Sequence, residues 1–170
     1  MVAFAGISHV ALTVTDLDIS QRFYTEVLGF VVVLDVGYGR ICMDPGTGFT
    51  LGLVKHEGAR GGSFTELNTG LDHLGLVASS REELEGWERR FDQFGVVYTP
   101  VRDLEMGHHL NFRDPDGIAL ELDAPNGLWE QARAALAAGQ TSPTEIAAFV
   151  AEHLGPELVP KTHLSPTTTD

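Results

Sequence analysis

The chain has 170 residues, of which 43% are hydrophobic and 21% charged, a balance typical of a folded globular protein. Its 24 acidic residues outnumber its 11 lysines and arginines, and the resulting formal charge of -13 repels the phosphates of nucleic acids and anionic lipids. The single cysteine, Cys42, excludes an internal disulfide and a zinc site built from several cysteines. No apolar run approaches the roughly 20 residues that cross a bilayer, so we expect a cytoplasmic protein without a nucleic-acid or membrane partner.

The chain contains an internal repeat. Residues 7–14 and 71–78 share one pattern, which is typical of a β-strand and has a histidine at its third position, His9 or His73. Each strand is followed by apolar residues at helical spacing and then by further stretches typical of strands. We therefore expect an α+β protein of two βαβββ modules, at about residues 5–56 and 70–125.

The elements are expected at matching places in the two modules. The predicted helices end at Gly29 in the first module and at Gly95 in the second. A strong β-turn signal, Asp-Pro-Asp-Gly, occupies residues 114–117. The clearest further strands are predicted at residues 30–34 and 48–54 of the first module and at residues 96–99 and 117–123 of the second.

The rest of the chain contains a link and a helical extension. Residues 57–69 are rich in glycine and polar residues and form either the link between the modules or a loop over the site. Two helices are expected beyond them, at residues 128–138 and from the capping Ser142 to about His153. The expected division is one domain over residues 1–126, a helical extension over residues 127–155 and a disordered tail over residues 156–170.

Side-chain alternation predicts which residues line the faces that the helices leave open. In the first strand Leu12 and Val14 face the helix, so His9 lies on the open face. The same parity places His73 and Glu121 on the open face of the second module, and all three converge if the open faces meet as a cup. Two imidazoles and one carboxylate bind Fe²⁺ in non-haem sites and also suit Mn²⁺, Co²⁺, Ni²⁺ or Zn²⁺. The alternative is a polar lining of a small-molecule cavity.

Several motifs carry a resemblance to a known family. They are residues 7–14 with 23–30, residues 71–74, and Asn-Phe-Arg-Asp-Pro-Asp-Gly-Ile-Ala-Leu-Glu at residues 111–121. They resemble the vicinal oxygen chelate superfamily, which contains glyoxalase I, type I extradiol dioxygenases, fosfomycin-resistance enzymes and metal-free bleomycin-binding proteins. The resemblance implies that the modules pair into an open barrel-like cup around a divalent metal, with His9, His73 and Glu121 as ligands. It also implies that the chain can form a homodimer.

The chain departs from part of this family at one ligand position. Glyoxalase I and methylmalonyl-CoA epimerase take a fourth ligand from the last strand of the first module, where this chain has Gly52. A three-ligand site resembles that of the extradiol dioxygenases, although the chain has Asn111 where those enzymes usually carry a catalytic tyrosine. We therefore expect a metal-dependent enzyme that chelates vicinal oxygens of a small substrate. Dioxygenase-type coordination with Fe²⁺ is favoured over lyase or isomerase chemistry.

His109 is the remaining catalytic candidate. Leu110 and Phe112 are expected to face the helix, so His109 faces the cup, where a neutral histidine can act as acid or base. The alternative is an exposed histidine at the end of a strand, beside His108.

Two other functions fit the sequence. A metal-free binding protein of the bleomycin-resistance type would sequester a cationic or aromatic ligand, which the net negative charge would attract. A partner-binding subunit would use the C-terminal helices at residues 128–153 as its interface.

Overall fold

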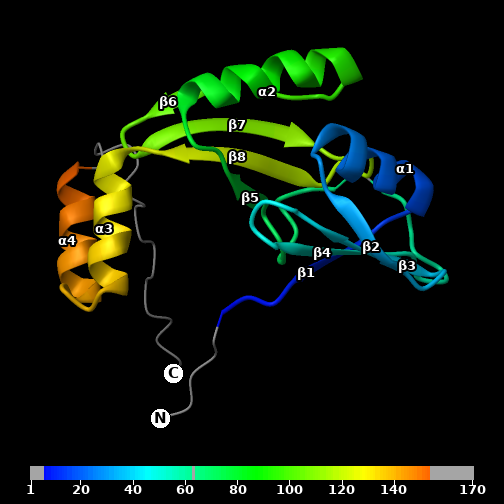
Figure 1. The fold of residues 1–170 in the computed structure, drawn as a ribbon, viewed down its shortest axis with the longest axis horizontal. Helices are drawn as coiled ribbons and strands as arrows, with labels where there is room; N and C mark the ends of the chain where they lie inside the picture. Colours follow the sequence, from blue (N-terminus) through cyan, green and yellow to red (C-terminus); the bar gives the residue numbers. More distant parts are fainter. Residues whose placement is uncertain (1–5, 63, 154–170) are drawn as a thin grey trace, which may run out of the picture.

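The computed structural model describes residues 6–62 and 64–153 and contains two four-stranded sheets (Figure 1). The first sheet has the spatial order β1-β4-β3-β2 and consists of β1 (Val10–Thr13), β2 (Val31–Asp35), β3 (Gly39–Met43) and β4 (Thr50–Val54). The second has the order β5-β8-β7-β6 and consists of β5 (Leu74–Val77), β6 (Arg102–Leu104), β7 (Gly107–Arg113) and β8 (Ala119–Pro125). In each sheet the first strand runs parallel to the last and the other pairs are antiparallel. The predicted α+β fold of two βαβββ modules is confirmed, and within the described residues the sheets do not close into a barrel.

The helix of the first module changes from an α-helix to a wider π-helical turn along its length. α1 (Leu17–Arg22) is capped by Asp16, whose carboxylate accepts hydrogen bonds from two backbone N–H groups of the first turn. The helix continues as a π-helical turn, η1 (Phe23–Val27), in which Leu28 donates to the carbonyl five residues back. This turn places Tyr24, which is 1% exposed, in the core between the modules.

The strand predicted at residues 96–99 forms only in part. Two backbone hydrogen bonds tie this segment to β7, one from Arg113 to Val97 and one from Thr99 to Asn111. The proline that follows has no N–H group and cannot continue the ladder. Regular pairing resumes only in the three-residue strand β6, which has no pattern of its own in the sequence.

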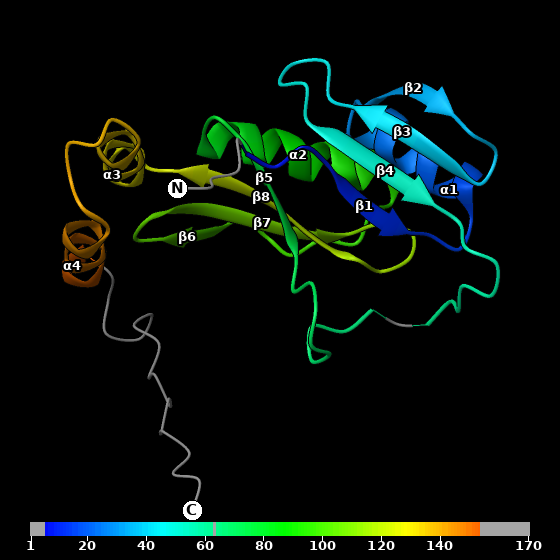
Figure 2. The same ribbon diagram turned by 90° about the horizontal axis from the view of Figure 1, so that it is seen from below.

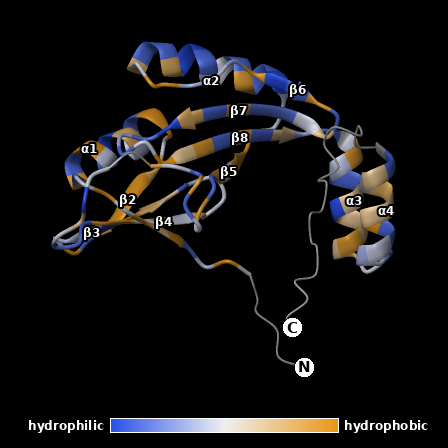
Figure 3. Ribbon diagram, turned by 180° about the vertical axis from the view of Figure 1, so that it is seen from behind, coloured by the Kyte–Doolittle hydropathy of each residue, from blue (hydrophilic) through white to orange (hydrophobic). Residues whose placement is uncertain are grey.

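One hydrophobic core extends through both modules. α2 (Arg81–Phe94) is hydrophilic along much of its length (Figure 3), and its apolar Leu84 and Phe91 are buried. Phe91 of this helix is fully buried, and its ring centroid lies 4.7 Å from that of Phe112 in β7. Phe112 in turn lies 6.5 Å from the ring of Phe23 in η1, so aromatic contacts join the two modules.

A buried carboxylate in the predicted β-turn also joins the modules. Asp114 is 5% exposed, and one of its oxygens accepts hydrogen bonds from the backbone N–H groups of Asp116 and Ile118. The other oxygen accepts a 3.1 Å hydrogen bond from the hydroxyl of Tyr24 in the first module. Asp116 accepts hydrogen bonds from the N–H and hydroxyl of Thr15. Burial raises the pKa of the Asp114 carboxyl, and the hydrogen bonds to it act in the opposite direction.

Two helices follow the second sheet and project from its end. α3 (Gly127–Ala137) and α4 (Pro143–His153) form a hairpin beyond β8, on the side away from the first module (Figures 1 and 2). Most of their side chains are exposed. In the part of the chain that the structure describes, no helix is long and apolar enough to cross a membrane. The tail predicted at residues 156–170 lies outside the described residues.

Replacing Tyr24 by Phe should lower the free energy of unfolding by about 1–3 kcal/mol, because a buried carboxylate loses a donor. The hydroxyl stabilises the charged form of Asp114, so its removal raises the pKa of that carboxyl further. The loss should therefore grow as pH rises through that pKa and shrink below it, which chemical denaturation at about pH 4 and about pH 7 measures. As a control, Tyr98→Phe removes a hydroxyl that donates to the exposed Asp92 and should cost less than about 0.5 kcal/mol. Equal losses in the two variants would contradict the prediction.

Candidate metal and substrate site

The open face of the second sheet carries polar side chains centred on β8. Glu121 lies in the middle of β8, and its partners in register are Gly75 of β5 and Asn111 of β7. Its neighbours Leu120 and Leu122 are buried in the core, so Glu121 points to the opposite, open face. Side chains in register on neighbouring strands share a face, so Gly75, Glu121 and Asn111 lie side by side at the centre of the site.

His73 lies on one side of the Glu121 carboxylate. Its Nε2 atom is 3.4 Å from Oε2 of Glu121, and its Nδ1 atom is 2.7 Å from Oδ1 of Asp72. Gly75 leaves the space beside the carboxylate open, because a Cβ atom there would lie 3.8 Å from Oε2 of Glu121.

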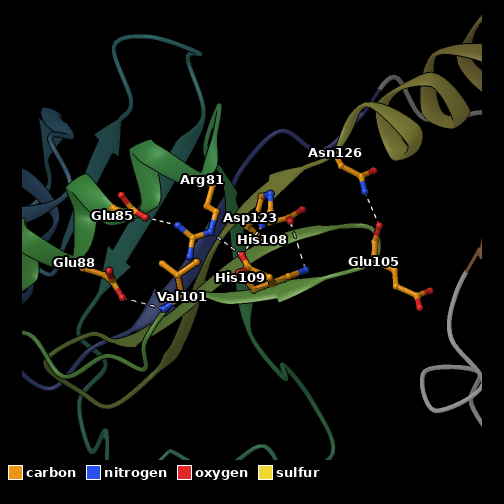
Figure 4. Close-up of polar contacts among 10 residues, drawn as sticks. Arg81, Glu85, Glu88, Val101, Glu105, His108, His109, Asp123 and Asn126 are labelled. Carbon is orange, nitrogen blue, oxygen red and sulfur yellow. Dashed lines mark hydrogen bonds and ion pairs between the residues drawn. The ribbon is translucent and has the colours of Figure 1, made fainter.

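His109 lies on the other side of the same carboxylate. Its Nδ1 atom is 2.7 Å from Oε1 of Glu121. Its Nε2 atom is 3.7 Å from Oδ1 of Asp123, and Figure 4 shows these two side chains. Burial raises the pKa of the Asp123 carboxyl, while the positive charge of a protonated His109 would lower it. The adjacent His108 is bonded instead to Asp103, with 2.8 Å between Nδ1 and Oδ1. The structure therefore places His109, and not His108, against Glu121.

A cavity of about 270 Å³ opens beside His73. Its polar lining residues come from the second module and from the link between the modules: Glu66, Asp72, His73, Tyr98, Thr99, Arg102, Asn111 and Arg113. Glu66 of the link forms a 2.5 Å ion pair with Arg113 of β7. The link thus borders the cavity and is tied to its edge.

His9 lies in a different place. It precedes β1 in the first sheet, is exposed, and has its Nδ1 atom 2.9 Å from the hydroxyl of Ser8. Among the residues described, no three His, Cys, Asp or Glu side chains form a group arranged to hold a metal ion. One copy of the chain therefore brings His73, Glu121 and His109 together but does not assemble His9 with them.

Two further residues define the site. Gly52 of β4 is paired in register with Ala11, so the first module presents no side chain at the fourth-ligand position. Arg102, which no pattern in the sequence indicates, lines the cavity from β6. Its strand is too short to show alternation, and only its pairing with β7 reveals the face on which Arg102 lies.

Comparison with known proteins gives one family match and several similar structures. A sequence model of the Glyoxalase/Bleomycin resistance protein/Dioxygenase superfamily matches residues 6–122. A solved glyoxylase/bleomycin resistance protein/dioxygenase domain from Frankia sp. EAN1pec is 37% identical, has a TM-score of 0.68, and the match covers 74% of this chain and 95% of that one. An integron cassette protein from the mobile metagenome of the Halifax Harbour sewage outfall is 26% identical with a TM-score of 0.57, covering 71% of this chain and 99% of that one.

A more distant structure shares the fold. The fosfomycin resistance protein FosX from Listeria monocytogenes, solved as a mutant with Mn(II) and 1S,2S-dihydroxypropylphosphonic acid, is 21% identical. Its TM-score is 0.61, and the match covers 78% of this chain and 99% of that one. No curated protein sequence matches the chain.

Gly107→Ala should disrupt the pairing of β7 with β8 that aligns His109 with the Glu121 strand. Gly107 has φ +155, and a Cβ atom there would lie 2.6 Å from the carbonyl oxygen of Ala124. The clash is with backbone, so we expect a loss of about 2–4 kcal/mol in the free energy of unfolding, measured by denaturation. Gly127→Ala is the matched control, because a Cβ atom there meets nothing within 4 Å. The prediction fails if both variants are as stable as the wild-type chain.

Proposed function

Because the chain belongs to the Glyoxalase/Bleomycin resistance protein/Dioxygenase superfamily, we propose that it is a metal-dependent enzyme acting on vicinal oxygens of a small substrate. A divalent ion would be held by His9, His73 and Glu121. The observation that carries the proposal is the Glu121 carboxylate, which lies between the imidazoles of His73 and His109. His73 also lines an open cavity.

The residues present suit a divalent ion. Asp72 holds Nδ1 of His73, so Nε2 is directed at Glu121, as when a carboxylate orients a metal-binding histidine. His109 contacts the second oxygen of Glu121 and orients that carboxylate in the same way.

The choice among chemistries follows from the number of ligands. Two imidazoles and one carboxylate leave coordination positions for a bidentate substrate, and Gly52 adds no fourth ligand. Dioxygenase-type coordination of Fe²⁺ is therefore proposed ahead of lyase or isomerase chemistry with Mn²⁺, Ni²⁺, Co²⁺ or Zn²⁺.

The metal and the protein have separate tasks in this proposal. A bound divalent ion supplies Lewis-acid stabilisation of negative charge on the substrate oxygens. His109 holds Glu121 through Nδ1, and its Nε2 atom, which lies 3.7 Å from Oδ1 of Asp123, is the atom that would accept or return a substrate proton. The amide of Asn111, in register with Glu121, orients the substrate over the same face.

We also propose that a second copy of the chain brings His9 to each site. β1 and β5 are both edge strands with unpaired backbone groups. The open face of the first sheet exposes apolar side chains, with Val31 46% and Leu34 53% exposed. A symmetric dimer that sets the first module of one copy against the second module of the other would cover both features and bring His9 to Glu121.

The purified chain should bind about one divalent ion, with Fe²⁺ loaded under anaerobic conditions, and His73→Ala should lose it. His109→Ala should weaken metal affinity by about 10-fold to 100-fold, because Glu121 loses the group that orients it. Elemental analysis and calorimetric titration measure both effects. The control is His108→Ala, whose ring is bonded to Asp103 instead. A chain that binds no added metal would overturn the proposal in favour of a metal-free binding protein.

Mixing two inactive variants tests the origin of His9. His9→Ala and His73→Ala should each bind no metal alone, because each lacks a ligand in every site. If His9 crosses between copies, a heterodimer has one intact site, and random exchange restores metal to about one quarter of the sites. Elemental analysis after co-refolding measures this fraction. No restoration in a proven heterodimer would show that His9 acts within its own chain.

A further inference from the structure

The cavity beside His73 contains one charge that the described residues do not neutralise. Both of its acidic lining residues are paired, Glu66 with Arg113 at 2.5 Å and Asp72 with His73 at 2.7 Å. Arg102, in contrast, forms neither an ion pair nor a side-chain hydrogen bond anywhere in the described ranges.

Strand pairing directs Arg102 to the face that carries the site. Arg102 is in register with His109, so the two side chains share the open face of the second sheet. Asn111 lies two residues along β7 on that face and lines the same cavity. Its side-chain amide also makes no hydrogen bond to any described residue. The guanidinium of Arg102 and the amide of Asn111 are thus two hydrogen-bond donors without a described partner on the face that carries Glu121.

We propose that Arg102 and Asn111 form an anion-binding subsite, so that the substrate carries an oxyanion, a carboxylate or phosphonate, in addition to its vicinal oxygens. This inference rests on the proposed function, because it names the substrate class of that same site. A planar guanidinium matches the two oxygens of such a group, and an amide N–H adds a further donor.

Because the chain is strongly acidic, an anionic substrate requires a local concentration of positive charge at its binding site. With a formal net charge of -13, the protein as a whole repels anions. An anionic substrate therefore gains entry only where positive charge is concentrated. A divalent ion at His73 and Glu121 together with the unpaired Arg102 would supply that concentration at one cavity.

The test compares ligands that share vicinal oxygens and differ in charge. The full chain, loaded with Mn²⁺ in the absence of oxygen, is titrated calorimetrically with 3,4-dihydroxybenzoate and with its neutral isostere 3,4-dihydroxybenzamide. A third titration with 3,4-dihydroxyphenylphosphonate distinguishes a phosphonate from a carboxylate as the preferred oxyanion. The variants are Arg102→Gln and, as a control, Arg89→Gln, which removes an exposed arginine of α2 that does not line the cavity.

We expect at least one anionic ligand to bind about 10-fold to 100-fold more tightly than the amide, and Arg102→Gln to abolish that preference. Arg89→Gln should keep it. Equal affinity for charged and neutral ligands, no binding of either anionic ligand, or a preference that survives Arg102→Gln would overturn the proposal.

Metal binding is titrated first, so that failure of the proposed metal-dependent function can be told apart from failure of the anion-binding subsite. If the chain binds no metal, the same three ligands are titrated against the metal-free protein. A charge preference that again disappears in Arg102→Gln would support the subsite without the metal, and its absence would overturn it.

Discussion

The arrangement of the two modules depends on the buried carboxylate of Asp114. A charge in a protein interior is costly unless donors surround it, and here the donors come from its own turn and from Tyr24 of the other module. The same carboxylate therefore stabilises both the β-turn and the contact between the two modules. Because this turn leads directly into β8, the contact that fixes the modules also sets the position of Glu121.

The two sheets have the same topology but unlike open faces. On the first, Val31 pairs with Met43 and Leu34 with Ile41, which makes that face apolar. On the second, a carboxylate lies between two imidazoles. The two modules therefore share a fold but differ in role. The first sheet has an apolar open face, and the second carries the ionisable groups of the proposed site.

This division explains why one chain contains only part of the proposed site. Glu121 and His109 are neighbours because they lie on the paired strands β8 and β7, and His73 directly precedes β5, the strand on the other side of β8. His9 belongs to the other sheet, whose edge strand and apolar face are both left open. Assembly of the metal ligands and burial of that apolar face would thus occur in the same event.

The sequence by itself determined the repeat, the α+β class, the helix caps and the faces of the long strands, because these depend on local periodicity and on residues close along the chain. It also placed Glu121 opposite the buried Leu120 and Leu122. Only the tertiary structure decided that His109 touches Glu121, that Arg102 shares its face and that His9 stands apart. Those relations depend on which strands become neighbours and in what register. Pairing between distant segments is set by packing of the whole core and leaves no local pattern in a strand as short as β6.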